Sequence, residues 1–229
     1  MTSRPLMLSA ATAALVVAAS SASPAMAADV VDLSAWDAKE LHDGWRASRM
    51  TDTPVYGADG EDIGEVSNIF VGADDRIQSI VVEAGGFLDI GDTHFRVPWD
   101  QVDLTPDAEG VQVPVNEDNV EDFDLFSEEP DAEPRTWRVT EVIGDYARMA
   151  DGSNYGIVHD LIFSKEGRLE SVVVNPAVGY GVGGYYAYPW YGYDYGFDPG
   201  ADVYEVPYAR DDIAELEPFD YDMIDAAVF

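Results

Sequence analysis

The chain has 229 residues and a large excess of acid, with 45 Asp and Glu against 12 Lys and Arg and a formal net charge of −33. Binding to a phosphate backbone requires Lys and Arg that displace counterions, so this charge excludes nucleic acid as an expected partner. There is no cysteine, so the fold must be held by its cores and strand pairing. Only Lys39 and Lys165 are lysines. Acid excess with few lysines predicts adaptation to high salt, where the Debye length falls to about 3 Å at 1 M ionic strength.

The N-terminus has the organisation of a secretory signal peptide. Arg4 precedes a small-residue apolar run over 6–19, and Ala25-Met26-Ala27 forms an A-x-A cleavage site. The alternative, a membrane anchor, is disfavoured because the apolar run is shorter than the roughly 20 residues that a spanning helix needs. We expect cleavage after Ala27, a periplasmic or secreted location, and no membrane span in the mature chain.

The mature chain is expected to begin with a helical segment, residues 28–45. Ser34 with Asp37 predicts the start of a short helix from Ala35 to about His42, and Gly44 ends it.

Short strands should follow this segment. They are expected at 47–50, 54–56, 63–71, 76–84 and 93–97, with a last hairpin over 104–113 that reverses at Pro106-Asp107. Many short strands with regular turn signals favour a small closed β-barrel over 46–115, because closure removes exposed strand edges.

Residues 116–137 form an acidic connection. Val120, Phe123 and Phe126 stand at helical spacing, which predicts one short amphipathic helix followed by a linker that ends near Pro134. The alternative is a wholly disordered connector.

The region after the connection repeats the first barrel. Asp151-Gly152 and Gly156 correspond to Asp59-Gly60 and Gly64, in constant register with a match of 168–174 to 76–82.

The end of the repeat is aligned through a shared Val-Pro-aromatic signature. Val206-Pro207-Tyr208 is matched to Val97-Pro98-Trp99, which makes residues 179–203 a Tyr- and Gly-rich insertion between the last strands. The predicted fold is therefore mainly β, with two tandem small barrels, short flanking helices, a second barrel over 138–216 and an acidic tail over 217–229.

The framework of the first copy resembles a known family. Its motifs are Arg46-Ala47-Ser48 with Val55-Tyr56, the run 59–66, the run 85–91 that begins Gly85-Gly86-Phe87-Leu88, and Val97-Pro98-Trp99. Together they resemble the PRC-barrel domain, over 46–115 well and over 138–213 less fully, since residues 175–180 replace the Gly-Gly-Phe-Leu segment. The resemblance implies a small β-barrel used for protein interaction or assembly. It implies no catalytic residues.

Reactive side chains do not form a recognisable catalytic arrangement. His42, His94 and His159 lie in different parts of the repeat and lack the spacing of metal ligands. His159-Asp160 is not accompanied by a G-x-S-x-G motif or by an activated serine, so we find no nucleophile. We expect no enzyme activity and no cofactor.

A weak calcium site is the one metal hypothesis that the acids suggest. Asp194, Asp198 and Asp202 recur every four residues, and calcium binds flexible carboxylate oxygens. The EF-hand pattern is missing, however, so we assign no specific metal site.

The aromatic residues of the presumed insertion are the best functional candidates. Rigid rings among glycines are typical of recognition surfaces. The candidate partner-binding residues are Tyr180, Tyr185, Tyr186, Tyr188, Trp190, Tyr191, Tyr193, Tyr195 and Phe197. The alternative is that these rings fold back over the second barrel or over the seam between the barrels. Sugar stacking, peptide binding and self-association would all use the same residues.

The sequence thus predicts an exported, non-enzymatic protein that acts through protein partners or self-association in the envelope, in assembly or stress tolerance. The alternative is a binding module for a small ligand or a cation such as Ca²⁺, which would use the acidic surface and the aromatic loop.

Overall fold

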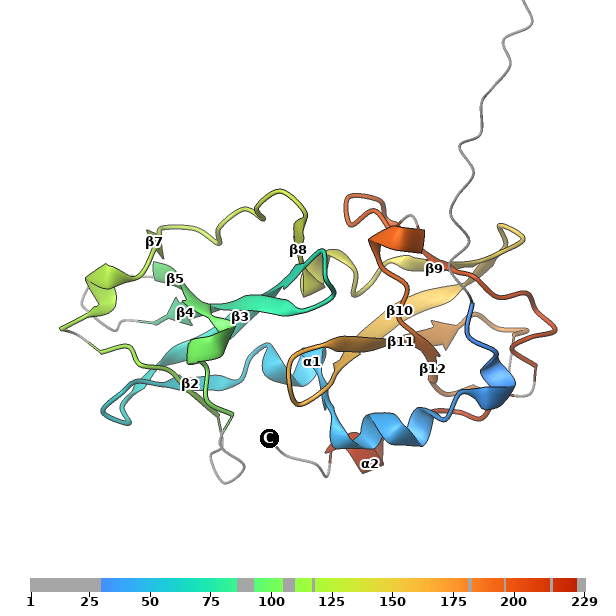
Figure 1. Ribbon diagram of the computed structural model, residues 1–229, viewed down its shortest axis with the longest axis horizontal. Helices are drawn as coiled ribbons and strands as arrows, with labels where there is room; N and C mark the ends of the chain where they lie inside the picture. Colours follow the sequence, from blue (N-terminus) through green and yellow to red (C-terminus); the bar gives the residue numbers. More distant parts are fainter. Residues whose placement is uncertain are drawn as a thin grey trace, which may run out of the picture.

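The computed structural model describes residues 30–85, 93–104, 110–116, 118–180, 183–195, 197–214 and 216–225. The expected signal peptide, most of the run 85–91 and the reversal at Pro106-Asp107 lie outside the described residues. The described chain forms two sheets, one for each repeat, which lie side by side along the long axis of the molecule (Figure 1). The predicted fold class, mainly β with two tandem units, is confirmed.

The first unit is built on the sheet order β6-β2-β3-β4-β5-β7. Its strands are β2 (Pro54–Tyr56), β3 (Asp62–Gly72), β4 (Ile77–Ala84), β5 (Thr93–Pro98), β6 (Val111–Gln112) and β7 (Leu125–Phe126). The apolar run Ile80-Val81-Val82 of β4 is buried on both faces, as its Ile and Val content predicts. The strand predictions at 54–56, 63–71, 76–84 and 93–97 are confirmed within a residue or two.

The second unit repeats this arrangement in the order β12-β11-β10-β9-β13. Its strands are β9 (Tyr146–Met149), β10 (Asn154–Phe163), β11 (Leu169–Pro176), β12 (Tyr186–Pro189) and β13 (Val203–Val206). Strand β13 runs parallel to β9, as β6 runs parallel to β2. The two units therefore share one topology.

Strand β12 is the counterpart of β5, which corrects the sequence alignment. Pro189 faces Ser171 across β12 and β11, as Pro98 faces Ser79 across β5 and β4. The match to Val97-Pro98-Trp99 is thus Tyr188-Pro189-Trp190.

The signature Val206-Pro207-Tyr208 corresponds instead to Val113-Pro114-Val115. The amide of Ala150 donates to the carbonyl of Tyr208, as the amide of Ala58 donates to that of Val115. The prediction that 179–203 is an inserted loop was wrong, because the segment contains a strand of the sheet. The error arose because Tyr188 of β12 replaces the valine of the Val-Pro pair, Val97, while another Val-Pro pair occurs in both units near a later strand.

The first strand of each repeat pairs with the sheet of the other unit, an arrangement that we call strand exchange. Strand β1 (Trp45–Arg46) precedes the first unit but pairs with β10 of the second, and β8 (Thr136–Arg138) precedes the second unit but pairs with β3 of the first. Trp45 and Trp137, at equivalent positions, are both buried by this exchange. One continuous hydrophobic core runs through both units as a result.

The turns between the long strands of the two units also meet. Arg76 and Arg168 form an antiparallel bridge, and the amide of Ile77 donates to the carbonyl of Gly167 at 2.9 Å. The amide of Leu169 donates in turn to the carbonyl of Asp75 at 2.8 Å. This pairing places a pseudo-two-fold axis at the seam between the units.

The helical segments differ most from the sequence predictions. The N-terminal segment contains two 3₁₀ helices, η1 (Leu33–Ala35) and η2 (Ala38–Asp43), capped by Asp32 and Asp37, and Gly44 ends the second as predicted. The capping role assigned to Ser34 was wrong, because Asp32 accepts the Ser34 amide.

Residues Ala47–Met50 form helix α1 rather than a strand. The helix turns the chain from β1, on the second sheet, toward β2, on the first. Its counterpart after β8 is the 3₁₀ helix η6 (Val139–Glu141). A further 3₁₀ helix, η4 (Trp99–Gln101), follows β5.

The acidic connection contains one 3₁₀ turn, η5 (Val120–Asp122), followed by strand β7. The amphipathic helix predicted there was wrong, since Leu125 and Phe126 pair with β5. The other helices among the described residues are η7 (Tyr193–Tyr195) and α2 (Tyr221–Asp225). Across the part of the chain that the structure describes, none of the helices is long and apolar enough to cross a membrane.

Candidate functional site: an acid-rimmed groove on the second unit

The nine aromatic candidates pack into the second unit and its seam. Tyr186, Tyr188 and Tyr191 are buried, and the other six are half-buried. Trp190 stacks on Trp137 with ring centroids 5.4 Å apart and on Tyr204 at 5.0 Å. The interpretation that these rings fold back over the second unit is therefore the one that the structure shows.

Tyrosine hydroxyls inside the second unit are hydrogen-bonded to one another. The Tyr155 and Tyr188 hydroxyls pair in the core, and burial raises the pKa of Tyr155 to about 12. The Tyr191 and Tyr208 hydroxyls pair at 2.6 Å. Buried hydroxyls need such partners, so these rings serve the packing of the unit.

Two tryptophans close the seam from opposite sides. The indole N–H of Trp190 donates to the Asp75 carboxylate at 2.8 Å, and desolvation raises the pKa of Asp75. At the equivalent place, Trp99 lies against Gly167, where a Cβ would come within 2.4 Å of the indole nitrogen. Asp75 and Gly167 both have positive φ, at 60° and 74°.

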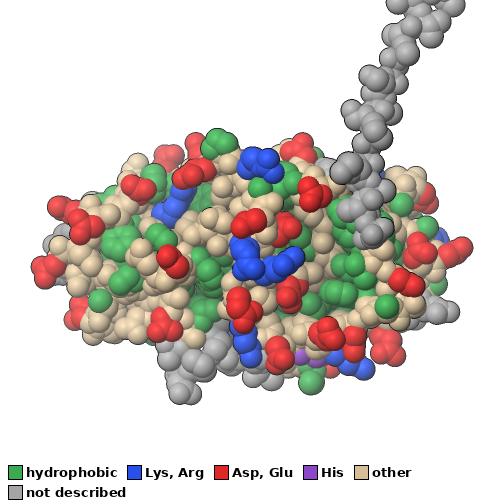
Figure 2. Space-filling model, in the orientation of Figure 1, with side chains coloured by type: hydrophobic (Ala, Val, Ile, Leu, Met, Phe, Trp, Pro, Cys, Tyr) green, Lys and Arg blue, Asp and Glu red, His purple; other side chains and the backbone are tan. Residues whose placement is uncertain are grey.

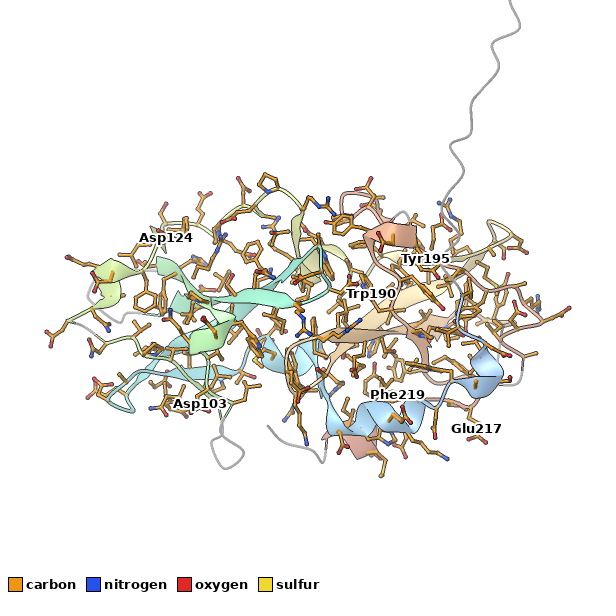
Figure 3. The ribbon with its side chains drawn as sticks, in the orientation of Figure 1. Asp103, Asp124, Trp190, Tyr195, Glu217 and Phe219 are labelled. Atoms are coloured by element: carbon orange, nitrogen blue, oxygen red, sulfur yellow. The ribbon has the colours of Figure 1, made fainter. Side chains whose placement is uncertain are left out.

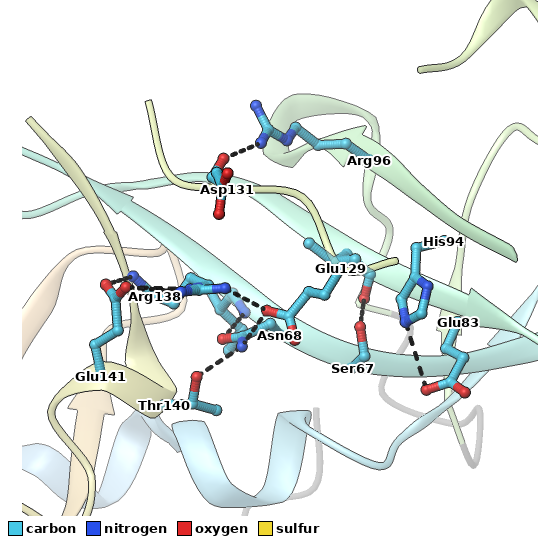
Figure 4. A network of polar contacts seen from close by, with 12 residues as sticks. Ser67, Asn68, Glu83, His94, Arg96, Glu129, Asp131, Arg138, Thr140 and Glu141 are labelled. Atoms are coloured by element: carbon cyan, nitrogen blue, oxygen red, sulfur yellow. Dashed lines mark hydrogen bonds and ion pairs between the residues drawn. The ribbon is translucent and has the colours of Figure 1, made fainter. Parts of the chain in front are cut away.

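Networks of polar side chains hold the exchanged strands on the sheets that they join. On the first unit, Asn68 donates to Thr140 and to Glu129, both at 2.7 Å, and Arg138 lies 2.9 Å from Glu141 and 3.6 Å from Glu129 (Figure 4). All of these residues except Asn68 come from the acidic connection or the start of the second repeat. The network therefore holds β8 on β3.

The second unit has Asp160 where the first has Asn68. Asp160 is fully buried, accepts hydrogen bonds from the amide and hydroxyl of Ser48, and lies 3.6 Å from Arg46. Desolvation raises the pKa of Asp160 against these interactions. Its contacts hold β1 and α1 in place, and the neighbouring His159 instead stacks on Tyr185 with centroids 4.2 Å apart.

The histidines are not brought together. His42 lies against Phe219 with ring centroids 5.4 Å apart, and His94 lies 3.7 Å from Glu83 on the first unit.

The acids of the metal hypothesis are separated as well. Asp194 lies near Asp75, Asp202 lies near Asp145, and Asp198 accepts the amide of Gly200. Within the described ranges, no group of three or more His, Asp and Glu side chains is placed to hold a metal.

A groove of about 1280 Å³ lies on the outside of the second unit. One wall is the N-terminal segment, residues 30–42, and the other is the C-terminal segment, residues 207–223, with Ala187 of β12 between them. Figure 1 shows these segments side by side, blue beside red, below the second unit. The two walls are far apart in sequence.

Hydrogen bonds to the second unit hold both walls. The amide of Val31 donates to the Tyr191 hydroxyl and its carbonyl accepts from the Tyr208 hydroxyl, both at 3.0 Å. The indole of Trp36 donates to the carbonyl of Ala187 at 3.0 Å, and the amide of Phe219 donates to the carbonyl of Tyr185. The groove is therefore formed by anchored backbone.

The rim of the groove is acidic and its interior is largely apolar. Six exposed carboxylates line it, against a single lysine, Lys39. They are Asp32, Asp37, Asp211, Asp212, Glu217 and Asp220. Figure 3 shows Glu217 and Phe219 beside the N-terminal helical segment. Val30, Val31 and Met223 remain 45%, 40% and 54% exposed.

Sequence reasoning missed this groove. Residues 217–229 were taken as an acidic tail, but Phe219 and Ile224 are buried against β12 and η2 in a small second core. The apolar residues of the tail were the available signal. The pairing of the two walls had no signal in the sequence.

Comparison with known proteins identifies both units. The model of the PRC-barrel domain matches residues 42–119 and again residues 135–213. A search of the curated proteins finds no match. Each matched region includes, near its start, the strand that pairs with the other unit. Each family domain therefore has its first strand in the sheet of the other copy.

Proposed function

The chain belongs to the PRC-barrel family, and from this premise we propose that it is an exported, non-enzymatic protein that docks another protein in the acid-rimmed groove of its second unit. The observation that carries the proposal is the groove itself, which combines an anchored apolar interior with a charged rim. Ligand pockets for small molecules span about 300–1,000 Å³, whereas this groove has about 1280 Å³ and is open.

The rest of the molecule supports a binding role over a catalytic one. Ser48, which is hydrogen-bonded to the buried carboxylate of Asp160, is engaged in holding the exchanged strand. Export is supported by the charged start, the apolar run and the A-x-A site within residues 1–27.

Site-specific photo-crosslinking in the native producing cells tests the docking. We place a benzoylphenylalanine at Met223 or Val31 inside the groove, and at Ile157 or Val178 as controls, which are exposed apolar positions that do not line it. The proposal requires one protein adduct, identified by mass spectrometry, at both groove positions and at neither control. Equal adducts at all four positions, or none in the groove, would refute it.

Export has its own test. The intact mass of the chain recovered from the envelope or the medium should correspond to a start at Ala28. A full-length chain retained in the cytoplasm would contradict the proposed location, without bearing on the groove.

A further inference from the structure

Resting on the proposed function, we infer that the groove receives a short cationic peptide segment of its partner, in which Lys or Arg side chains alternate with aliphatic ones. The inference names the chemistry of the occupant from the groups that the groove offers.

The charges of the rim favour a cation. The groove is lined by six carboxylates and one lysine. Acidic side chains are also spread over both units, as Figure 2 shows. Four of the six, Asp32, Asp37, Asp212 and Asp220, already accept hydrogen bonds from nearby backbone amides. Among the described contacts Asp211 and Glu217 have none, so their oxygens are available to an ammonium or guanidinium group.

The interior of the groove favours aliphatic side chains between those cations. Seven large apolar side chains of the described residues are exposed, and three of them, Val30, Val31 and Met223, line this one groove. Exposed apolar side chains that are gathered in one hollow with a polar rim favour an interaction site. If the acidic surface only attracted cations in general, exposed apolar side chains in one groove would not be needed.

Two of the polar groups that line the groove are not free to bind a sugar, and the acidic rim disfavours an anionic surface. The indole N–H of Trp36 and the hydroxyl of Tyr208 are engaged with the carbonyls of Ala187 and Val31, so neither is a free donor for a sugar hydroxyl. The carboxylates of the rim repel an anionic lipid headgroup. The chemistry that remains is basic and apolar.

Calorimetric titration of the mature chain tests the inference. The probe is a ten-residue capped peptide of alternating Lys and Leu, and the comparison peptides are its Glu/Leu and Lys/Ser counterparts. We expect binding of the Lys/Leu peptide alone at 0.15 M salt. The double variant D211N/E217Q should weaken this binding about fivefold, as expected for the loss of two exposed ion pairs.

The matched control removes the same charge from the first unit. Glu121 and Asp124 are exposed and lie outside the groove, so E121Q/D124N should bind the Lys/Leu peptide as the wild type does. Met223→Ser should also weaken binding, because it removes apolar contact without changing charge. The melting temperatures of all variants verify that they are folded.

Several results would overturn the inference. They are equal losses in the groove and control variants, equal binding of the Lys/Ser peptide, preference for the Glu/Leu peptide, and no heat at millimolar Lys/Leu peptide. Each leaves the docking function to be decided by the crosslinks, so the two failures are distinguishable.

Discussion

From the packing at the seam between the units, we predict that any side chain at position 167 destabilises the protein. Its φ of +74° lies in the left-handed region, and a Cβ would stand 2.4 Å from Nε1 of Trp99. The backbone conformation costs a non-glycine residue about 1–2 kcal/mol. Forced displacement of a packed neighbour adds about 1–3 kcal/mol. Gly167→Ala should therefore destabilise the protein by about 2–5 kcal/mol.

Gly152→Ala is the matched control for this substitution. Gly152 lies in the same unit with a φ of +82°, but nothing stands within 4 Å of its Cβ position. It should lose only the backbone contribution of about 1–2 kcal/mol. The difference between the two variants measures the contact with Trp99.

Urea unfolding in constant salt, followed by tryptophan fluorescence and by circular dichroism, gives the two free energies of unfolding. Adding Trp99→Leu should recover part of the loss in Gly167→Ala and none of the loss in Gly152→Ala. If Gly167→Ala costs no more than Gly152→Ala, the described packing of Trp99 across the seam is incorrect.

Four further predictions follow from the charges and the exchange. Desolvation and the nearby Asp202 raise the pKa of Asp145 to about 6, so the protonated form is favoured in the folded state. The stability that this gives is complete below pH 4 and is lost as pH rises through 6, and Asp145→Asn should flatten the pH dependence of the melting temperature in that window; an unchanged profile would contradict the assignment. Asp160→Ala should cost about 3–5 kcal/mol in urea unfolding, because it leaves Arg46 and Ser48 without their buried partner, whereas Asp160→Asn, the residue of the first unit, should cost clearly less; equal costs would deny the polar role. Melting temperature should rise from low salt to molar sodium chloride as self-repulsion is screened, and a flat or falling curve would contradict the adaptation to high salt. Cleavage at a protease site introduced at Asp131 should leave the two halves associated on gel filtration, and their separation without denaturant would contradict the strand exchange.

The long strands were predictable because their patterns have one interpretation. The run Ile77–Ala84 is apolar enough to be buried on both faces, and its turn residues fix its ends. The same holds for Leu169–Pro176, which is why the repeat could be aligned there.

The exchange was not predictable, because a two-residue strand such as Trp45–Arg46 pairs through its backbone and leaves no periodic pattern. The β12 strand was hidden for another reason. Tyr186 and Tyr188 occupy positions where the first unit has Phe95 and Val97, so the signature of the strand changed while its place in the sheet did not.

The candidate site was the least predictable part. Nine aromatic residues in one segment have the composition of a recognition loop and also that of a core, and only the register of β12 distinguishes the two. The groove needs Val31 beside Tyr208, a contact across 177 positions of sequence. Nothing in the sequence of either segment indicates that the two lie together.

The exchange of β1 and β8 also determines the order in which the two sheets can form during synthesis. The first sheet lacks β8 until residue 138 has been made, and β1 has no place to bind until β10 follows it. The first sheet therefore keeps an open edge on β3 until Thr136–Arg138 have been made, and Trp45 cannot join the second sheet until Phe163 has been made. Open edges of this kind are where nascent chains aggregate. A strongly acidic chain repels its neighbours during that interval, so the same charge that marks the mature surface also protects the unfinished one.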